Sequence, residues 1–493
     1  MKYKKVHCIG IGGIGISALA RYYLDNGAIV SGSDSTDSDL IQSLRDQGII
    51  INIGNDAKNI PVDADLIVYT IAIDYQNDVE YKEAKEREPT QNKVTVLSYA
   101  EALGELTRES KTIAICGTHV KTTTTAMAYN ALHQAGLNPT LIVGSLIDHN
   151  GKKTNYIGGQ KKDKTLNKNI DNDKNNQYLI IEACEYKRSF LNYESEYVLV
   201  TNIDEDHLDY YKDISDIRDA FREFASNINH MGCLIIHRPE EIVFTESIFI
   251  KNTDNIYTEK SNSKNQKSKI KKSRGYRLII ADDTVNKDDI KLSVMGDHNK
   301  SNAQLVVALG QVLAKDIYDN EIEKDKFNDN VLMGLKDFIG TWRRMEYKGH
   351  SANGAIVYDD YAHHPNEMIP TITTLREHYK DKKIVLVFQP HLQSRTKDFY
   401  EEFVDAMMLA DIVYVLPVHH ARAEHDHGIN NYKIVASIID RHRAEGKNID
   451  ECQAYTLDFD NAKEELLKYN NYHVIVTMGA GKNNIIANQL TDN

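Results

Sequence analysis

Residues 111–132 constrain the fold of this chain more than any other stretch of its 493 residues. A short apolar run, 112–116, leads into Gly-Thr-His-Val-Lys-Thr-Thr-Thr-Thr (117–125), and a helical pattern follows. A strand, a tight turn and a helix beginning at Lys-Thr bind nucleotide phosphates, because backbone N–H groups at the helix N-terminus face the phosphate oxygens. The spacing departs from G-x-x-x-x-G-K-[ST], since Ile115 and Val120 occupy its two glycine positions. The pattern still predicts an α/β domain that handles ATP.

Short apolar runs alternate with helical patterns along most of the chain, as in parallel α/β sheets. We predict three units, at 1–107, 108–338 and 339–493. Polar stretches near 160–177 and 260–274 are interpreted as surface insertions of the second unit, with an active-site lid as the alternative for the first of them. The predicted strands are 6–11, 29–33, 49–53, 66–71 and 94–97 in the first unit, 178–182, 197–201 and 232–237 in the second, and 355–358, 383–388, 412–416 and 473–478 in the third.

Composition excludes several classes of partner. The net charge of −13 argues against non-specific affinity for nucleic acid or for anionic membranes. The five cysteines show no C-x-x-C spacing, so neither a disulfide framework nor a zinc site is indicated, and a reducing compartment fits. No apolar run approaches the roughly 18 residues of a membrane span. We therefore predict a cytoplasmic protein without a nucleic-acid or membrane partner.

A glycine-rich turn follows the first predicted strand. Residues 10–15 read Gly-Ile-Gly-Gly-Ile-Gly and satisfy G-x-G-x-x-G between a strand and a helix. Asp34 ends the next predicted strand, at about the distance where dinucleotide-binding folds carry an acidic residue. Glycines at this place let the backbone approach a pyrophosphate, so the turn fits NAD and also a UDP-sugar.

Polar side chains follow two predicted strands of the second unit. Glu182 ends one apolar run, and Thr201 ends another, followed by Asn202 and His207. In a parallel sheet both strand ends lie at the carboxyl edge, where ligands bind. A carboxylate and an imidazole there, with the Thr122 hydroxyl, predict a site for Mg²⁺ that bridges the γ-phosphate. The alternative for His207 by itself is a surface loop.

Four further segments carry candidate chemistry. Residues 296–302 read Gly-Asp-His-Asn-Lys-Ser-Asn, where the first asparagine is equally a helix cap. Residues 359–365, Asp-Asp-Tyr-Ala-His-His-Pro, follow a predicted strand, and their carboxylates suit ribose hydroxyls or Mg²⁺. Residues 389–396, Gln-Pro-His-Leu-Gln-Ser-Arg-Thr, offer an arginine that can fork onto a carboxylate. The histidines within 419–427 suggest a metal site at first, but their spacing does not correspond to a tetrahedral ligand set. We therefore predict a solvated loop.

These motifs together resemble the Mur ligase family. The resemblance rests on I-G-I-G-G-I-G, G-T-H-V-K-T-T, E-A-C-E-Y-x-x-S-F, T-N-I-x-x-D-H, D-D-Y-x-H-H-P and Q-P-H-x-x-x-R-T, in this order from residue 9 to 481. It implies a UDP-binding Rossmann-like domain, a central P-loop ATPase domain with a mainly parallel sheet, and a Rossmann-like C-terminal domain. It also implies ATP-dependent ligation, with Mg²⁺, of L-alanine to the lactyl carboxylate of UDP-N-acetylmuramate through an acyl phosphate, in peptidoglycan precursor synthesis.

The resemblance also assigns roles to individual residues. The residues expected at the UDP-sugar are Gly10, Gly12, Gly13, Gly15, Ser33, Asp34 and Thr70. Those expected at ATP are Gly117, Thr118, His119, Lys121, Thr122, Thr123, Asn302, Arg344 and Asp359. Thr122, Glu182 and His207 are expected to hold Mg²⁺. The catalytic residues implied are Lys121, His207, His363, His391 and Arg395, the last three at alanine and the acyl phosphate.

Three departures from the family pattern bear on activity. Val120 replaces a glycine before the phosphate-loop lysine, Leu392 stands where some relatives carry a second arginine, and Lys482 replaces a usual aspartate. We expect Val120 to be forced into a backbone conformation that normally requires glycine. Three rival functions stay open: a ligase that recycles a whole peptide onto the same sugar, an NAD oxidoreductase, and a UDP-sugar-binding homologue that does not turn over ATP. Monomer and homodimer both remain open.

Overall fold

The computed structural model describes residues 2–90, 94–149, 151–159, 177–208, 210–245, 256–258, 275–419, 427–446 and 453–491. The chain forms two compact units, one made of Met1–Ser293 with Lys300–Phe338 and the other of Val294–Asn299 with Ile339–Asn493. We call them unit 1 and unit 2. The predicted insertions at 160–177 and 260–274 lie almost entirely outside the described residues. Among the helices of the described part, none is long and apolar enough to cross a membrane.

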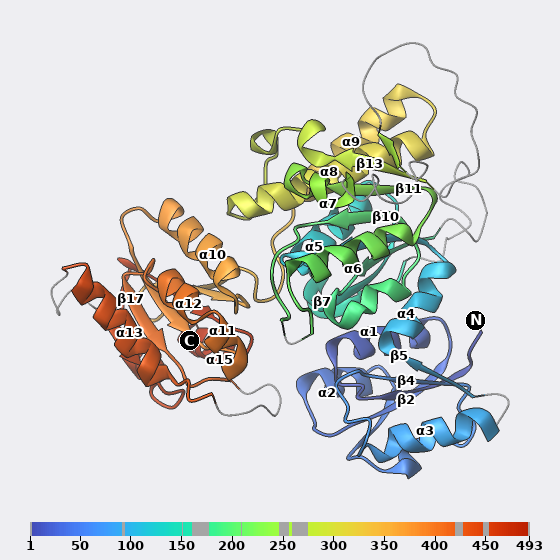
Figure 1. The fold of residues 1–493 in the computed structure, drawn as a ribbon, viewed down its shortest axis with the longest axis horizontal. Coiled ribbons are helices and arrows are strands. Elements are labelled where there is room, and N and C mark those ends of the chain that lie inside the picture. Colours follow the sequence, from blue (N-terminus) through green and yellow to red (C-terminus); the bar gives the residue numbers. More distant parts are fainter. Residues whose placement is uncertain are drawn as a thin grey trace. The chain divides into compact units, whose positions relative to one another are not determined.

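The first sheet of unit 1 is parallel throughout, with the strand order β3-β2-β1-β4-β5 (Figure 1). The order reverses between β1 and β4, so the loops after these two strands open the crevice in which α/β folds bind ligands. The strands are β1 (Lys5–Ile9), β2 (Ile29–Asp34), β3 (Ile50–Ile53), β4 (Leu66–Tyr69) and β5 (Thr95–Ser98). The helices are α1 (Ile14–Asp25), α2 (Asp39–Arg45), α3 (Val79–Thr90) and α4 (Tyr99–Arg108).

The second sheet of unit 1 has the order β12-β13-β11-β10-β6-β9-β7-β8, and only β7 and β8 pair antiparallel among its described strands. Strand β6 lies inside the sheet between β10 and β9, and all its residues after Lys111 are buried. The strands are β6 (Lys111–Cys116), β7 (Thr140–His149), β8 (Lys152–Ile157), β9 (Tyr178–Glu182), β10 (Ser195–Val200), β11 (Ile228–Ile236), β12 (Ile256–Thr258) and β13 (Tyr276–Ile280). The helices are α5 (Lys121–Gln134), α6 (Ile214–Ser226), α7 (Glu241–Thr245), α8 (Asp297–Ile317) and α9 (Glu321–Lys336).

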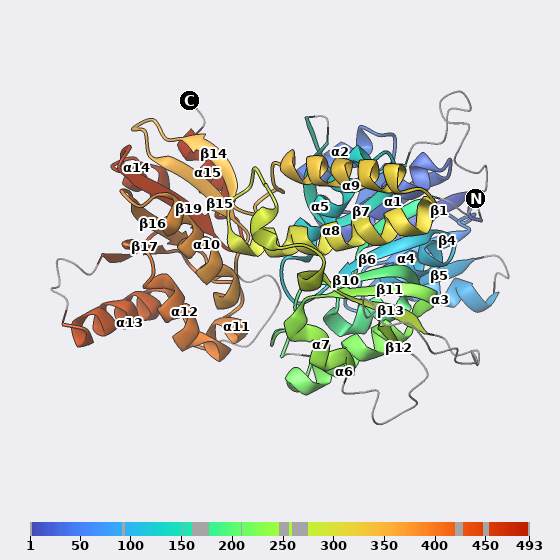
Figure 2. The ribbon, with the colours of Figure 1, turned by 90° about the horizontal axis from the view of Figure 1, so that it is seen from above.

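Helix α1 joins the two sheets of unit 1. It packs on β1 and β2 on one side and on β7 and β8 on the other, which explains why even its polar residues Ser17 and Arg21 are buried. One apolar cluster therefore runs from the first sheet into the second. On another face, α9 lies along α5, and Gly334 allows the close approach, since a Cβ there would stand 2.7 Å from the Cα of Ala131 (Figure 2).

The sheet of unit 2 has the order β14-β15-β19-β16-β17-β18, with only β14 antiparallel among the described strands. Alternate residues of its strands enter two apolar clusters, as for Leu386 on one face and Val385 on the other. The strands are β14 (Glu346–His350), β15 (Ile356–Asp360), β16 (Lys383–Phe388), β17 (Ile412–Val415), β18 (Ala454–Thr456) and β19 (His473–Met478). The helices are α10 (Pro365–His378), α11 (Gln393–Asp398), α12 (Tyr400–Met407), α13 (Asn431–Ala444), α14 (Ala462–Leu466) and α15 (Asn484–Thr491).

Candidate active site

The loop between β6 and α5 has the geometry of a phosphate loop. Gly117 has a φ of 140°, and a Cβ there would lie 2.0 Å from the Thr201 hydroxyl at the end of β10. Val120 immediately precedes the helix with a φ of 57° and a ψ of 13°. The expected glycine-like conformation of this valine is therefore present. For a β-branched residue the left-handed region costs about 1–2 kcal/mol.

Neighbouring hydrogen bonds hold the strained loop. The N–H of Thr118 donates to the carbonyl of Asn202 at 3.0 Å, and the N–H of His119 donates to the side-chain oxygen of Asn202 at 2.9 Å. The Thr201 hydroxyl donates to the carbonyl of His119 at 2.7 Å. The start of the loop that follows β10 thus fixes the phosphate loop from one side, and the strain persists because several bonds would break to relieve it.

Lys121 begins α5 and forms a buried ion pair with Glu185. Its Nζ lies 2.8 Å from Oε2 of Glu185 and donates to the carbonyls of Gly117 and Thr118 at 2.6 and 2.9 Å. Burial by itself would lower the pKa of Lys121, but the Glu185 carboxylate raises it above the ordinary value. Burial would raise the pKa of Glu185, and the charge of Lys121 instead holds it below its usual range. Both groups are therefore charged beside the phosphate loop.

A second carboxylate meets the threonine that follows the lysine. The Thr122 hydroxyl donates to Oε2 of Glu182 at 3.0 Å, and the N–H of Gly144 donates to the same oxygen at 2.9 Å. His207 does not join this pair directly, because its Nε2 lies 3.4 Å from Oε1 of Glu185. Of the three predicted metal ligands, Thr122 and Glu182 therefore contact each other, whereas His207 lies beside Glu185.

This donor set suits a magnesium ion that keeps several waters. Among the described residues, no three His, Cys, Asp or Glu side chains converge as a complete protein cage for a metal. Mg²⁺ prefers oxygen ligands and is usually bound through one or two carboxylates together with substrate phosphates and water. The Thr122 hydroxyl and the Glu182 carboxylate, side by side at the start of α5, fit that requirement.

The glycine turn after β1 closes on β2 and β4. The N–H of Gly12 donates to Oδ2 of Asp34 at 2.8 Å, so this carboxylate holds the turn. A Cβ at Gly10 would stand 2.4 Å from Cγ2 of Thr70, which follows β4. The hydroxyl of Ser33 donates to the buried carboxylate of Glu80. The predicted UDP-sugar residues therefore gather at the crevice between β1 and β4, although Asp34 and Ser33 use these oxygens within the protein.

In unit 2 the polar loops of the predicted motifs gather at the carboxyl edge of the sheet. The His363 ring lies 5.5 Å from the His391 ring, centroid to centroid. Arg344 lies over the Tyr361 ring at 5.2 Å and 3.5 Å from Oε1 of Glu367. Arg395 lies in α11, which begins directly after Leu392. Asn302, the remaining predicted ATP residue, is buried on α8 in unit 1.

Comparisons with known proteins agree with this geometry. Family models match as "Mur ligase family, catalytic domain" at residues 5–111, "Mur ligase middle domain" at 115–310 and "Mur ligase, glutamate ligase domain" at 343–481. The UDP-N-acetylmuramate–L-alanine ligase of Agathobacter rectalis is 36% identical over 97% of this chain and 95% of its own length. That of Hydrogenobaculum sp. is 35% identical over 97% and 96%. The chain belongs to the Mur ligase family.

Solved structures support the same assignment. The structural match to the UDP-N-acetylmuramate-alanine ligase of Thermotoga maritima covers 99% of this chain and 98% of that ligase. The TM-score is 0.68 and the sequence identity is 26%. A murein peptide ligase of Psychrobacter arcticus covers 99% of both chains with a TM-score of 0.62 and 21% identity, which shows the fold alone. The predictions of an α/β fold with three Mur ligase domains and of an ATP-dependent, amide-forming ligase are confirmed.

The structure places one predicted ligand of this Mur ligase differently from its expected role. Asp359 is fully buried, and its carboxylate accepts from Nε of Arg343 at 2.8 Å and from the Thr477 hydroxyl. Arg343 also donates to the carbonyls of Gly479 and Gly481, at 2.5 and 2.8 Å. Asp359 therefore holds loops of the site together in this structure, and its contact with ATP stays a prediction. Arg343, which directly precedes Arg344, was missed by the sequence-based assignment.

Two further residues of the site were not found from the sequence. Glu185 is the second glutamate of E-A-C-E, and only its buried contact with Lys121 distinguishes it. His419 belongs to the cluster that we assigned to a solvated loop, yet its ring lies 5.6 Å from the His391 ring, and its N–H donates to the carbonyl of Pro390 at 2.8 Å. His419 is half-buried and contacts His391 as well as solvent, whereas residues 420–426 lie outside the described residues.

Asn299 does not cap α8 as the alternative assignment proposed. The helix begins at Asp297, and the Asn299 side chain instead donates back to the carbonyl of Met295 at 2.6 Å.

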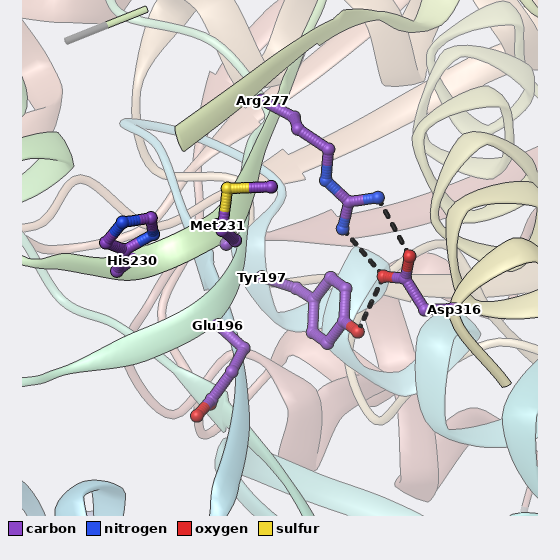
Figure 3. Close-up of a pocket in the computed structure, with 7 residues that line it drawn as sticks. Glu196, Tyr197, His230, Met231, Arg277 and Asp316 are labelled. Carbon is purple, nitrogen blue, oxygen red and sulfur yellow. Dashed lines mark hydrogen bonds and ion pairs between the residues drawn. The ribbon is translucent and has the colours of Figure 1, made fainter. Parts of the chain in front are cut away.

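A pocket of about 360 Å³ opens at the opposite, amino-terminal edge of the central sheet (Figure 3). Arg277, at the start of β13, binds Asp316 through two nitrogens at 2.8 and 2.6 Å, and the Tyr197 hydroxyl donates to the same carboxylate at 3.0 Å. These charges compensate each other, and the pocket is separate from the phosphate loop because it lies at the other ends of the strands.

Proposed function

We propose that this chain joins L-alanine to the lactyl carboxylate of UDP-N-acetylmuramate with consumption of ATP, in the synthesis of peptidoglycan precursors. The observation that carries the proposal is the phosphate loop itself, where the Lys121–Glu185 ion pair and the Thr122–Glu182 hydrogen bond lie side by side. The names of the similar ligases indicate the sugar nucleotide and the amino acid. A cytoplasmic location and the domain limits 1–107, 108–338 and 339–493 belong to the same proposal.

The reaction needs no nucleophile from the protein. A lactyl carboxylate oxygen attacks the γ-phosphorus of ATP, the bond to the bridging oxygen breaks, and ADP leaves. The amine of alanine then attacks the acyl carbon, loses a proton, and expels inorganic phosphate as the amide bond forms. Catalysis consists of positioning and charge neutralisation.

The residues of unit 1 would supply most of the charge neutralisation. Lys121, already charged, would turn from Glu185 toward the β- and γ-phosphates. Mg²⁺ would be held by Thr122 and Glu182, together with His207, which lies beside Glu185. When bound, the ion would neutralise charge on the transferred phosphoryl group. The glycine turn after β1 would receive the diphosphate at the N-terminus of α1.

The residues of unit 2 would orient alanine. Arg395 can fork onto the alanine carboxylate, and the neighbouring imidazoles of His363 and His391 can face the acyl phosphate. Arg344 and Asn302 would contact the nucleotide. Asp359 would act through Arg343 by holding the loops in place.

The deciding experiment measures phosphate release by the purified chain. ATP, Mg²⁺, UDP-N-acetylmuramate and L-alanine are supplied together and then omitted one at a time, beside a Val120→Gly variant. Release that requires all four components supports the proposal. Release only with a tripeptide in place of alanine would assign the chain to peptide recycling. Activity in Val120→Gly alone would mean that the valine disables the loop, and silence in both would refute the ligase.

A further inference from the structure

Tyr99 lies beside the glycine turn of the first sheet, on the helix that leads into the second sheet. It is the first residue of α4, directly after β5. A capping box fixes this position: the Ser98 hydroxyl accepts from the N–H of Glu101 at 3.3 Å, and the Glu101 carboxylate accepts from the N–H of Ser98 at 2.8 Å. The tyrosine side chain therefore starts from a well-defined backbone.

The Tyr99 ring abuts the last glycine of the turn. A Cβ at Gly15 would stand 2.8 Å from Cζ and 2.9 Å from Cε2 of Tyr99. These atoms belong to the phenol end of the ring, so the hydroxyl lies beside the first turn of α1. The N–H groups of a first helical turn have no partner within the helix and attract anions. The hydroxyl therefore borders the place where a diphosphate would bind.

The electrostatic surroundings of the phenol keep it neutral. Burial raises the pKa of Tyr99 above its ordinary value, and the negative charge of Glu182 raises it further. The hydroxyl consequently stays protonated and can only add a hydrogen bond, not another negative charge. It forms no hydrogen bond with any residue that the structure describes, although the side chain is half-buried.

We propose that Tyr99 is a substrate-positioning residue whose hydroxyl donates a hydrogen bond to an anionic oxygen of UDP-N-acetylmuramate, bound at the glycine turn before α1. This inference rests on the proposed function and extends it to a residue outside the quoted motifs. Packing alone does not require the hydroxyl, because phenylalanine would fill the space beside Gly15 equally well. A hydrogen bond to a charged oxygen explains why a polar atom stands there.

The test is Tyr99→Phe, which keeps the ring and removes the donor. We expect KM for UDP-N-acetylmuramate to rise about tenfold, as for loss of one hydrogen bond to a charged group, with KM for ATP and alanine changed less than about twofold. The matched control is Tyr3→Phe. In the wild-type chain the Tyr3 hydroxyl donates to the Glu105 carboxylate on α4 at 3.0 Å, away from the glycine turn. An unchanged KM for the UDP-sugar, or an equal rise for all three substrates, would overturn the proposal.

Direct binding separates this proposal from the proposed function. Calorimetric titration with UDP-N-acetylmuramate in the absence of ATP should show a similar loss of affinity in Tyr99→Phe, whether or not the wild-type chain is active. UDP-N-acetylglucosamine, which lacks the lactyl group, identifies the oxygen. An equal loss for both ligands assigns the hydrogen bond to the diphosphate, and a loss for the muramate alone assigns it to the lactyl carboxylate. Equal affinity of variant and wild type for both ligands would refute the contact.

Discussion

Val120 has a strained backbone conformation, yet the phosphate loop around it keeps its geometry. Its left-handed backbone is retained because Asn202 and Thr201 bind the residues before it, and because the Thr124 hydroxyl donates to its carbonyl at 3.0 Å. The sequence predicted this conformation, since only the local motif was needed. The partner of Lys121 could not be predicted, because Glu182 ends β9 and Glu185 follows it closely, and tertiary packing decides which of them meets the lysine.

Removal of the charge of Glu185 should destabilise the unliganded protein. Glu185→Gln leaves Lys121 buried without its counterion, and we expect a loss of about 3 kcal/mol in the free energy of unfolding. Phosphates of bound ATP would restore a partner, so the rise in melting temperature on adding Mg·ATP should be larger than in wild type. Glu196→Gln is the control, because Glu196 accepts from Thr112 and Asn229, at the start of β10 rather than at the phosphate loop. An ATP-induced rise equal to that of wild type would contradict the prediction.

Asp360 should make the stability of unit 2 depend on pH. Its carboxylate is buried and accepts from Ala362 and Thr371, and burial raises its pKa from 3.8 to about 6. The folded state therefore favours the protonated form, whose stabilisation is complete below about pH 4 and is lost as the pH rises through about 6. The loss is at most about 3 kcal/mol.

The chain offers a local probe for this effect. Its single tryptophan, Trp342, lies in unit 2, so denaturation followed by tryptophan fluorescence reports on that unit. Between pH 4.5 and 7 the free energy of unfolding should fall in wild type and fall less in Asp360→Asn, where Asp359, whose pKa burial also raises, still contributes. Asp411→Asn in the same unit, with a half-exposed carboxyl paired to Arg376, should retain the slope. A slope fully retained in Asp360→Asn would assign it to other groups.

At the scale of elements, burial on both faces decided which strands could be predicted. The predicted strands at β9, β16 and β19 coincide with the observed ones, because each is a continuous apolar run between parallel neighbours. The first strand was predicted to end at residue 11, two residues beyond the observed end of β1, since Gly10 with a φ of 73° already begins the turn. Strands β7, β8 and β14 were missed, because antiparallel strands with one exposed face carry polar residues that hide them.

The N-cap of α4 should influence substrate binding as well as stability. Ser98→Ala removes half of the capping box, and we expect a loss of about 1 kcal/mol in the free energy of unfolding. Because Tyr99 is the next residue, KM for the UDP-sugar should rise more than KM for ATP. Asn320→Ala removes the equivalent cap of α9, where Asn320 accepts from Glu323 at 2.9 Å, and should lower stability without this selectivity. Equal kinetic effects of the two variants would refute the link between the cap and the substrate.

At the scale of the molecule, a buried polar contact ties the first two sheets into one unit. Asn155 on β8 is fully buried, donates to the carbonyl of Ile14 at 2.5 Å and to the Ser17 hydroxyl at 2.8 Å, and accepts from Arg21. All three partners belong to the start and middle of α1, the helix whose N-terminus would receive the diphosphate. Besides the apolar packing, the placement of that helix against the central sheet therefore relies on a polar side chain that no sequence motif marks.

Asn155→Ala should destabilise unit 1 selectively. The variant deprives the buried Arg21 of its main partner and leaves only the Ser43 hydroxyl at 3.2 Å, so we expect a loss of about 3 kcal/mol in the free energy of unfolding of this unit. Denaturation followed by far-ultraviolet circular dichroism should shift to lower denaturant, while the Trp342 fluorescence transition of unit 2 should stay in place. Tyr156→Phe is the control, since it removes only the exposed hydrogen bond to Asp25 and should cost less than about 1 kcal/mol. If both signals move together in Asn155→Ala, the two units unfold cooperatively and the selectivity is refuted.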